Sequence, residues 1–160
     1  MNIRIGFGLD IHRFEEGYDF WLGGIKIAYV KGAVGHSDAD VLIHAICDAL
    51  LGAANLGDIG MHFPDSSEVY KNIDSKILLE RVINILNKNN YSINNIDSTI
   101  VLQKPKISEY IPQMKAILAR TMAIDESAIS IKATTSETLG YEGREEGISA
   151  HAVVLIQQIK

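Results

Sequence analysis

The second half of the chain alternates between segments with the pattern of strands and segments with the pattern of helices. Residues 96–103 and 129–135 are rich in β-branched side chains, and residues 148–157 form a further run of strand character. Between the first two runs, apolar residues at helical spacing follow Pro112, which the first turn of a helix tolerates. Strands separated by helices favour crossover connections onto one sheet, which indicates an α/β fold.

The first half adds two helices and a hairpin. Apolar residues repeat at helical spacing over residues 39–54, with Ser37 or Asp38 as the expected N-cap, and again after Asp74 or Ser75. Before them, Ile3, Ile5 and Phe7 alternate as in a strand, and glycines interrupt a second strand or tight hairpin at 21–27. We therefore predict an α/β (α+β two-layer) sandwich in one domain, 1–160, with a mixed four-stranded sheet, helices on one face and a small N-terminal hairpin.

Composition restricts the partners and the compartment. Fifteen basic against 20 acidic residues leave no cationic field for nucleic acid or an anionic membrane. No apolar run approaches the roughly 18–20 residues of a transmembrane helix, and charged residues near the N-terminus argue against a signal peptide. The single cysteine, Cys47, excludes an intrachain disulfide and fits a small core residue in a reducing compartment. We expect a soluble, cytoplasmic protein.

Four of the five histidines lie within the first 62 residues, and two of them fit a metal site. Asp10 and His12 are two residues apart, so in a strand their side chains leave the same face. His44 lies in the middle of a predicted helix. Two imidazoles and one carboxylate suit Zn²⁺ and leave its fourth position open for a substrate. The alternative is a turn and a hydrogen-bonded core histidine.

Asp40, His44 and Asp48 recur every four residues and form one polar stripe on that helix. A solvated helix face explains Asp40 best. For Asp48 we also consider a role as the acceptor for the second N–H of a ligating imidazole. Just before the helix, His36 and Ser37 add donors to an N-terminus that attracts anions, although ordinary capping explains Ser37 equally well.

Two further segments carry groups suited to a phosphorylated ligand. Thr134 and Thr135 end a predicted strand and can donate to phosphate oxygens, and Glu137 can hold a hard cation such as Mg²⁺. The 57–60 loop lets backbone approach a ligand, with Asp58 as an acceptor for sugar hydroxyls, but a helix C-cap has the same pattern. The basic bend 102–106 is otherwise a solvated turn. No P-loop, hydrolase-elbow or paired CxxC motif occurs in the sequence.

Together, these segments match those of one known family in order, from about residue 5 to residue 155. The chain resembles the 2-C-methyl-D-erythritol 2,4-cyclodiphosphate synthases of the non-mevalonate isoprenoid pathway. The matching segments are Gly8–His12, Gly35–Val41, Ala45–Ala54, Leu56–Gly60, Phe63–Asp65, Ile111–Met114, Lys132–Thr135, Gly143–Arg144 and Glu146–Gly147.

The resemblance implies a zinc-dependent phosphorus–oxygen lyase. Such an enzyme converts 4-diphosphocytidyl-2-C-methyl-D-erythritol 2-phosphate to the 2,4-cyclodiphosphate and CMP, because the substrate's own 2-phosphate attacks its β-phosphorus. It implies Zn²⁺ or another divalent cation at Asp10, His12 and His44, and Mg²⁺ or Mn²⁺ on the diphosphate at Glu137. His36 and Thr135 match the residues that stabilise the transition state.

The resemblance also implies a homotrimer with active sites between neighbouring chains. The positions that would contact the substrate are Asp10, His12, His36, Ser37, Asp58, Ile59, Gly60, Phe63, Asp65, Leu102, Pro105, Lys106, Ile107, Ser108, Ala133, Thr134, Thr135, Glu137, Tyr141 and Arg144.

Two positions depart from the family pattern: Leu9 stands where phenylalanine is common, and Glu145 replaces a small residue. Both match positions near the central cavity of the family's trimer, so the resemblance leaves open whether that cavity binds an isoprenoid diphosphate in this chain. His62 fits a surface residue, and His151 a packed or edge residue of the last strand. A zinc phosphohydrolase using a metal-bound water and a non-enzymatic metal-binding trimeric scaffold are the competing interpretations.

Overall fold

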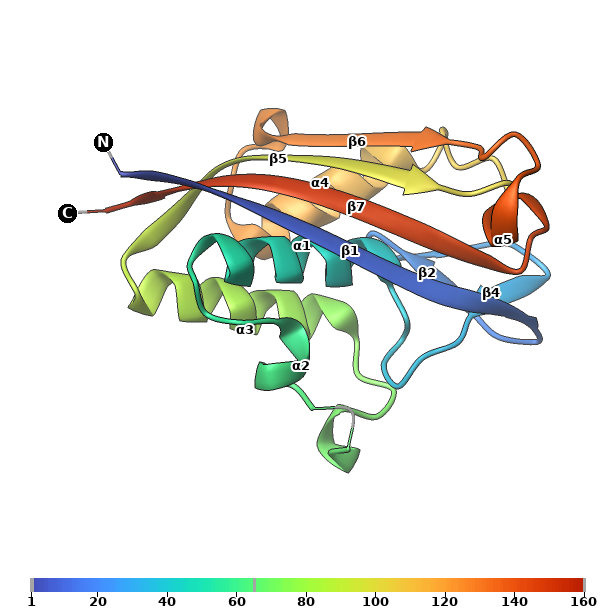
Figure 1. The fold of residues 1–160 in the computed structure, drawn as a ribbon, viewed down its shortest axis with the longest axis horizontal. Coiled ribbons are helices and arrows are strands. Elements are labelled where there is room, and N and C mark those ends of the chain that lie inside the picture. Colours follow the sequence, from blue (N-terminus) through green and yellow to red (C-terminus); the bar gives the residue numbers. More distant parts are fainter. Residues whose placement is uncertain (1, 65, 160) are drawn as a thin grey trace.

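A computed structural model describes residues 2–64 and 66–159 of the chain. Figure 1 shows its helices and strands. The strands are β1 (Ile3–Glu16), β2 (Phe20–Leu22), β3 (Ile25–Ile27), β4 (Lys31–Ala33), β5 (Tyr91–Val101), β6 (Ile129–Thr134) and β7 (Gly147–Gln158). The helices are α1 (Val41–Ala53), α2 (Ile59–His62), α3 (Ser75–Lys88), α4 (Ile111–Met122) and α5 (Gly140–Gly143), with 3₁₀ turns at Glu68–Tyr70 and Glu126–Ala128.

The main sheet is mixed and has the strand order β4-β1-β7-β5-β6. β5 and β6 run parallel, and the other neighbouring strands are antiparallel. The predicted α/β class and the separate hairpin, formed by β2 and β3, are confirmed. The predicted strand count was one too low, because β4 adds a fifth strand to the edge of β1. Its three residues, Lys31-Gly32-Ala33, are too few to show a strand pattern.

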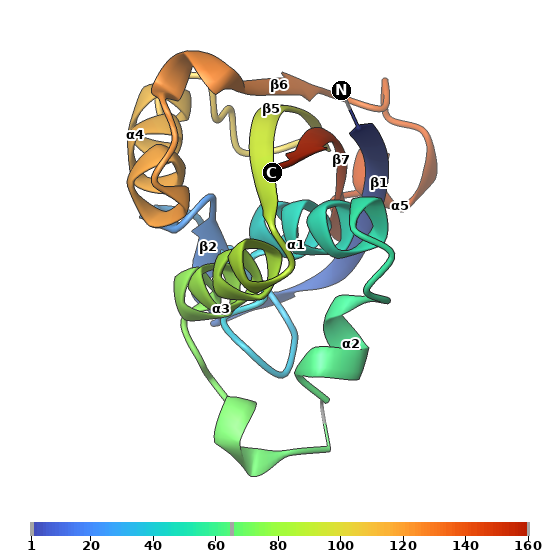
Figure 2. The same ribbon diagram turned by 90° about the vertical axis from the view of Figure 1, so that its left-hand side faces the viewer.

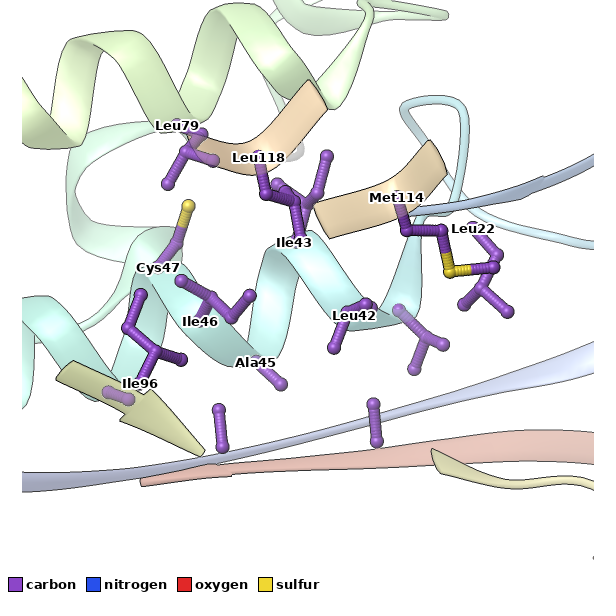
Figure 3. Close-up of a cluster of buried hydrophobic side chains, with 14 of the residues drawn as sticks. Leu22, Leu42, Ile43, Ala45, Ile46, Cys47, Leu79, Ile96, Met114 and Leu118 are labelled. Carbon is purple, nitrogen blue, oxygen red and sulfur yellow. The ribbon is translucent and has the colours of Figure 1, made fainter. Parts of the chain in front are cut away.

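All three long helices lie on one side of the sheet, as predicted (Figures 1 and 2). α1 packs on β1 and β7, while α3 packs on α1 and α4. The core between them is aliphatic: it contains Ile46, Leu79, Ile96 and Leu118, and the buried thiol of Cys47 points towards Leu79 (Figure 3). Burying each large side chain contributes about 1.5–3 kcal/mol to folding. Among the described residues, no helix is long and apolar enough to cross a membrane.

Two glycines allow α1 to lie directly on β1. A Cβ atom at Gly6 would stand 1.9 Å from the carbonyl oxygen of Ala49, and one at Gly8 would stand 1.9 Å from that of Ala45. No side chain fits at either position, so helix and strand are in backbone contact. Because the next inward residue of the strand is Asp10 and the residue before Ala45 is His44, this contact brings the predicted metal ligands together.

β1 continues well beyond the predicted residues, to Glu16, and its side chains alternate strictly. Even-numbered residues point towards α1. The odd-numbered residues lie on the opposite side of the sheet and remain exposed, with Ile5 at 71% and Phe7 at 61%. This apolar surface, called the free face below, consists of Ile3, Ile5, Phe7, Leu9, Ile11 and, on β7, Val153.

Asp40 corrects two expectations about the start of α1. It is the N-cap, in place of Ser37 or Asp38, and it is fully buried instead of solvated. Its carboxylate accepts hydrogen bonds from the backbone N–H groups of Gly23, Gly24 and Ile43, at 2.9, 2.7 and 3.0 Å. Burial raises the pKa of Asp40. The side chain thus fixes the hairpin to the helix that carries His44. At α3 the N-cap is Asp74, one of the two predicted residues.

Candidate active site

Three polar atoms converge where α1 crosses β1. The Oδ2 atom of Asp10 lies 2.9 Å from Nε2 of His12 and 3.0 Å from Nδ1 of His44, and these two nitrogens are 3.2 Å apart. Each residue offers one ligand atom, so the three form a candidate site for a divalent cation, called the metal cluster below. The sequence prediction of this trio is confirmed as a structural arrangement.

Hydrogen bonds outside the metal cluster determine which ring nitrogens carry protons. Nδ1 of His12 lies 3.1 Å from the carbonyl oxygen of Val34, which can only accept, so this nitrogen donates. Nε2 of His44 lies 2.9 Å from Oγ of Ser75. Since the Ser75 hydroxyl donates its own proton to Asp38, it accepts from His44. Both neutral imidazoles therefore direct a lone pair at the same carboxylate oxygen of Asp10.

Three acceptors in mutual contact repel one another unless a cation lies among them. A tetrahedral Zn²⁺ ion with bonds of about 2.0 Å places its ligand atoms about 3.3 Å apart, close to the separations within the metal cluster. A divalent cation fits this donor set. In the metal-free protein, protons take its place. Burial disfavours the charged forms of Asp10 and His44, but hydrogen bonds with His12 and His44 lower the pKa of Asp10, and the contact with Asp10 raises the pKa of His44.

A cavity of about 230 Å³ opens over the metal cluster. Eight residues predicted to bind substrate or metal line it: Asp10, His12, His36, Ser37, His44, Ile59, Gly60 and Phe63. The lining also includes Gly35, Tyr70, Ile73 and Leu78, which sequence reasoning missed. Asp58, the exposed N-cap of α2, accepts from the backbone N–H of Met61 at the edge of this region. The predicted Asp65 lies outside the described residues.

Two polar side chains have roles that the helix pattern did not predict. Oδ1 of Asp48 accepts from the backbone N–H of Ile59 at 2.8 Å, so Asp48 holds the start of α2. The second N–H of His44 goes instead to Ser75, whose backbone N–H also donates to Asp38. The expectation that Asp48 supports His44 is therefore wrong. Ser75 was visible in the sequence only as a candidate helix cap.

The remaining predicted contacts gather at the carboxyl ends of the parallel strands β5 and β6, at the right of Figure 1. The backbone N–H of Leu102 donates to the carbonyl oxygen of Thr134 at 3.0 Å, and Oγ1 of Thr135 donates to Glu137 at 3.1 Å. The two segments thus meet at one end of the sheet. Here Leu102 and Ile107 are buried, and the exposed members are Lys106, Ser108, Ala133, Thr134, Thr135, Glu137 and Arg144. The half-buried members are Pro105 and Tyr141.

Within the described residues, the cavity above the metal cluster is lined by only the first of these two groups of predicted site residues. None of the residues at 102–108 or 133–144 lines the space above the metal cluster. His36 lines that space, where its Nε2 atom donates to the carbonyl oxygen of Ser67 at 3.1 Å, whereas Thr135 lies in the other group.

The two other histidines lie outside the metal cluster. His62 is half-buried and donates to the carbonyl oxygen of Leu56 at 2.8 Å. His151 is on β7 in the middle of the sheet, so it is not an edge residue, and its ring lies 6.1 Å from that of Phe7.

Comparisons with known proteins identify the family of this chain. The model of the YgbB family matches residues 3–157. The 2-C-methyl-D-erythritol 2,4-cyclodiphosphate synthase of Bacteroides fragilis is 58% identical over 99% of this chain and 100% of its own length. The synthase of Porphyromonas gingivalis is 58% identical over 96% of this chain and 94% of its own length.

Solved structures give the same result. A CDP complex of IspF from Plasmodium falciparum superposes with a TM-score of 0.87 at 36% identity, covering 99% of this chain and 98% of that one. The bifunctional IspDF of Campylobacter jejuni superposes with a TM-score of 0.95 at 38% identity, covering 99% of this chain and 43% of that longer chain. The fold, the metal cluster and these relatives lead to one conclusion: the chain belongs to the YgbB family of 2-C-methyl-D-erythritol 2,4-cyclodiphosphate synthases.

Proposed function

We propose that the metal cluster holds Zn²⁺ and is the centre at which this synthase forms its product. The enzyme converts 4-diphosphocytidyl-2-C-methyl-D-erythritol 2-phosphate to the cyclodiphosphate and CMP, in isoprenoid biosynthesis. The observation that carries the metal assignment is the convergence of two imidazole lone pairs and one carboxylate oxygen within about 3 Å of one another. Bound there, Zn²⁺ would polarise the reacting phosphate oxygens.

The protein's own residues position the phosphates and stabilise charge. The substrate supplies its own nucleophile, the 2-phosphate, so the chain needs no nucleophilic side chain. His36 and Ser37 line the cavity beside the metal cluster, where His36 is assigned to the transition state. Asp58 and Gly60 are assigned to the ribose or methylerythritol side. Ile59, Phe63 and Asp65 are assigned to further contacts with the substrate. Because cyclisation brings two groups of one molecule together, correct orientation supplies much of the acceleration.

The nucleotide half of the site is assigned to the ends of β5 and β6. Residues 102–108, called the nucleotide segment below, would frame the cytosine together with Ala133 and Thr134. Thr135 would donate to the phosphates, and Glu137 would hold Mg²⁺ or Mn²⁺ on the diphosphate. The carboxylate of Glu137 is exposed and close to Thr135, which supports this assignment. Tyr141 and Arg144 complete the set. The CDP bound by the Plasmodium relative supports a cytidine nucleotide as ligand.

We further propose that the complete active site forms between copies of the chain in a homotrimer. Among the described residues, none of the nucleotide segment lines the cavity above the metal cluster, which supports a neighbouring chain as the source of the nucleotide half. The free face supports assembly, because it exposes Ile5 and Phe7 to the extent of 71% and 61%. A contiguous apolar surface of this kind is typical of a protein–protein contact. Residues 1–160 then act as one catalytic domain, for which a cytoplasmic location remains our prediction.

Product analysis by phosphorus NMR tests the proposed chemistry. Incubation of the zinc-loaded protein with the substrate should give the cyclodiphosphate and CMP in equal amounts. A zinc phosphohydrolase would instead release linear erythritol phosphates, because water would attack in place of the 2-phosphate. A metal-binding scaffold would leave the substrate unchanged and would gain no thermal stability from CMP. Either of these results would overturn the proposal.

A further inference from the structure

Glu145 follows α5 in a left-handed backbone conformation, with φ at 58°. Glycine adopts this conformation without penalty, whereas a residue with a Cβ atom is strained in it. Its backbone N–H donates to the carbonyl oxygen of Glu142, as in a common helix ending. Position 145 therefore suits glycine. With glutamate there, favourable contacts of the side chain have to offset the free-energy cost of the strained backbone.

The side chain of Glu145 joins two other parts of the fold. Its Oε1 atom lies 3.1 Å from Nζ of Lys104, and its Oε2 atom accepts from the hydroxyl of Tyr29 at 3.0 Å. The amino group of Lys31 in β4 donates to the carbonyl oxygen of Glu145 at 2.9 Å. The carboxylate is about one quarter exposed, and three segments distant in sequence meet at this one residue.

Tyr29 is a fixed partner. Its ring packs on those of Phe14 and Phe20, with centroids 6.2 and 6.3 Å away. Partial burial and the bond to Glu145 raise the pKa of Tyr29 to about 12, so its hydroxyl remains a donor at neutral pH. The hydrogen bond from Lys104 is the main cause that lowers the pKa of Glu145, which is therefore ionised.

Lys104 is part of the nucleotide segment. Apart from the contact with Glu145, this segment is held to the rest of the protein mainly at Leu102 and Ile107. Leu102 is bound to the end of β6 through its backbone N–H, and the side chain of Ile107 is buried. Between them, the amide oxygen of Gln103 accepts from the backbone N–H of Thr138 at a long 3.3 Å. The side chain of Lys104 is 65% exposed and extends to Glu145 across the surface.

We propose that Glu145 is a positioning residue for the nucleotide segment, holding Lys104 against Tyr29 and the end of α5. This inference rests on the proposed function, in which residues 102–108 receive the cytidine nucleotide. A segment that is already ordered loses less conformational entropy when its ligand binds. Glu145 therefore favours nucleotide binding without touching the nucleotide.

The substitution Glu145→Gly separates positioning from stability. Glycine relieves the left-handed strain, so the melting temperature should stay level or rise. The nucleotide segment should nevertheless loosen. In the whole protein, amide hydrogen exchange across residues 103–110 should accelerate, and CMP should bind about two- to five-fold more weakly, the range expected for an exposed ion pair. KM should rise by the same factor, with kcat unchanged.

Two further variants complete the test. Lys104→Ala should weaken CMP binding as Glu145→Gly does, and the double variant should be no weaker than the single ones, because one contact is lost in all three. Lys26→Ala is the matched control. It removes a lysine of similar exposure, which pairs with Asp19 at 2.7 Å instead of with Glu145, and should leave CMP affinity unchanged.

The outcomes are distinguishable. If the parent protein binds CMP and Glu145→Gly binds it equally well with unaltered exchange at 103–110, the positioning role is refuted and the proposed function stands. Loss of affinity that tracks a fall in melting temperature would also refute it, since Glu145 would then be merely structural. If the parent binds no CMP, the nucleotide assignment and this inference both fail.

Discussion

Ser75→Ala is the substitution that tests the outer hydrogen bonds of the metal cluster most sharply. The fully buried Ser75 hydroxyl accepts from His44 and donates to Asp38, which keeps the other ring nitrogen of His44 free to bind a cation. Losing such an outer partner typically weakens metal binding 10- to 100-fold. Ser37 stays within 3.1 Å of the same nitrogen and replaces part of the lost bond. We therefore expect the lower end, about tenfold, or about 1.4 kcal/mol.

The assay is competition for Zn²⁺ against a chelator of known affinity, with Ser98→Ala as control. Ser98 is also buried, and its hydroxyl donates to the carbonyl oxygen of Ser130, far from the cluster in the β5–β6 ladder. Each variant should lose about 1 kcal/mol of stability, the usual contribution of one hydrogen bond. Only Ser75→Ala should lose zinc affinity. Parental affinity in Ser75→Ala would refute the assigned tautomer of His44 and the reasoning built on it.

Three further predictions concern the same region. His44→Ala should abolish turnover and zinc retention while circular dichroism still shows a folded protein, since an open catalytic metal seldom holds a fold together; full activity with bound zinc would contradict the assignment. Asp40→Ala leaves three buried backbone N–H groups without their acceptor. The free energy of unfolding, measured in urea, should fall by about 3–5 kcal/mol. A loss below about 1 kcal/mol would show that water replaces the carboxylate. The metal-free protein should have a higher melting temperature at pH 6 than at pH 8, because the pKa of His44 is raised in the folded state. Protonation of His44 then stabilises the folded protein fully below the unfolded-state pKa, near 6.5, and this stabilisation is lost as the pH rises through the folded-state pKa. An equal fall in a metal-free His44→Ala variant would assign the effect to another group.

Sequence reasoning worked where periodicity and backbone geometry determine the outcome. The spacing of Asp10 and His12 placed both side chains on one face of a strand. His44 was predicted in the middle of a helix, and it lies within α1. The reasoning failed where a polar group owes its position to distant partners. Asp40 reads as solvated from its place on a helix, but it is buried because the hairpin supplies two N–H donors.

Some features leave no signal in a single sequence. Ser75 follows a helix cap, and no sequence pattern predicts its contact with His44, because this contact depends on how α3 packs against α1. β4 is too short for a strand pattern and exists because β1 extends far enough to pair with it. The ligand trio also follows from a close approach, at Gly6 and Gly8, that only the packed structure displays.

The central claim is that each active site combines the metal cluster of one chain with the nucleotide segment of the next, and complementation tests it directly. One variant, His44→Ala, has an inactive metal cluster. The second variant has an inactive nucleotide segment, produced by Lys106→Glu and, where needed, further substitutions within residues 102–108. When the two are refolded together in equal amounts, about three quarters of the trimers are mixed, and each mixed ring contains one interface with two intact halves. About one quarter of all sites should then be active, although each variant alone is inactive. Activity no higher than that of the separate variants, with mixed trimers confirmed by native mass spectrometry, would place each site within a single chain.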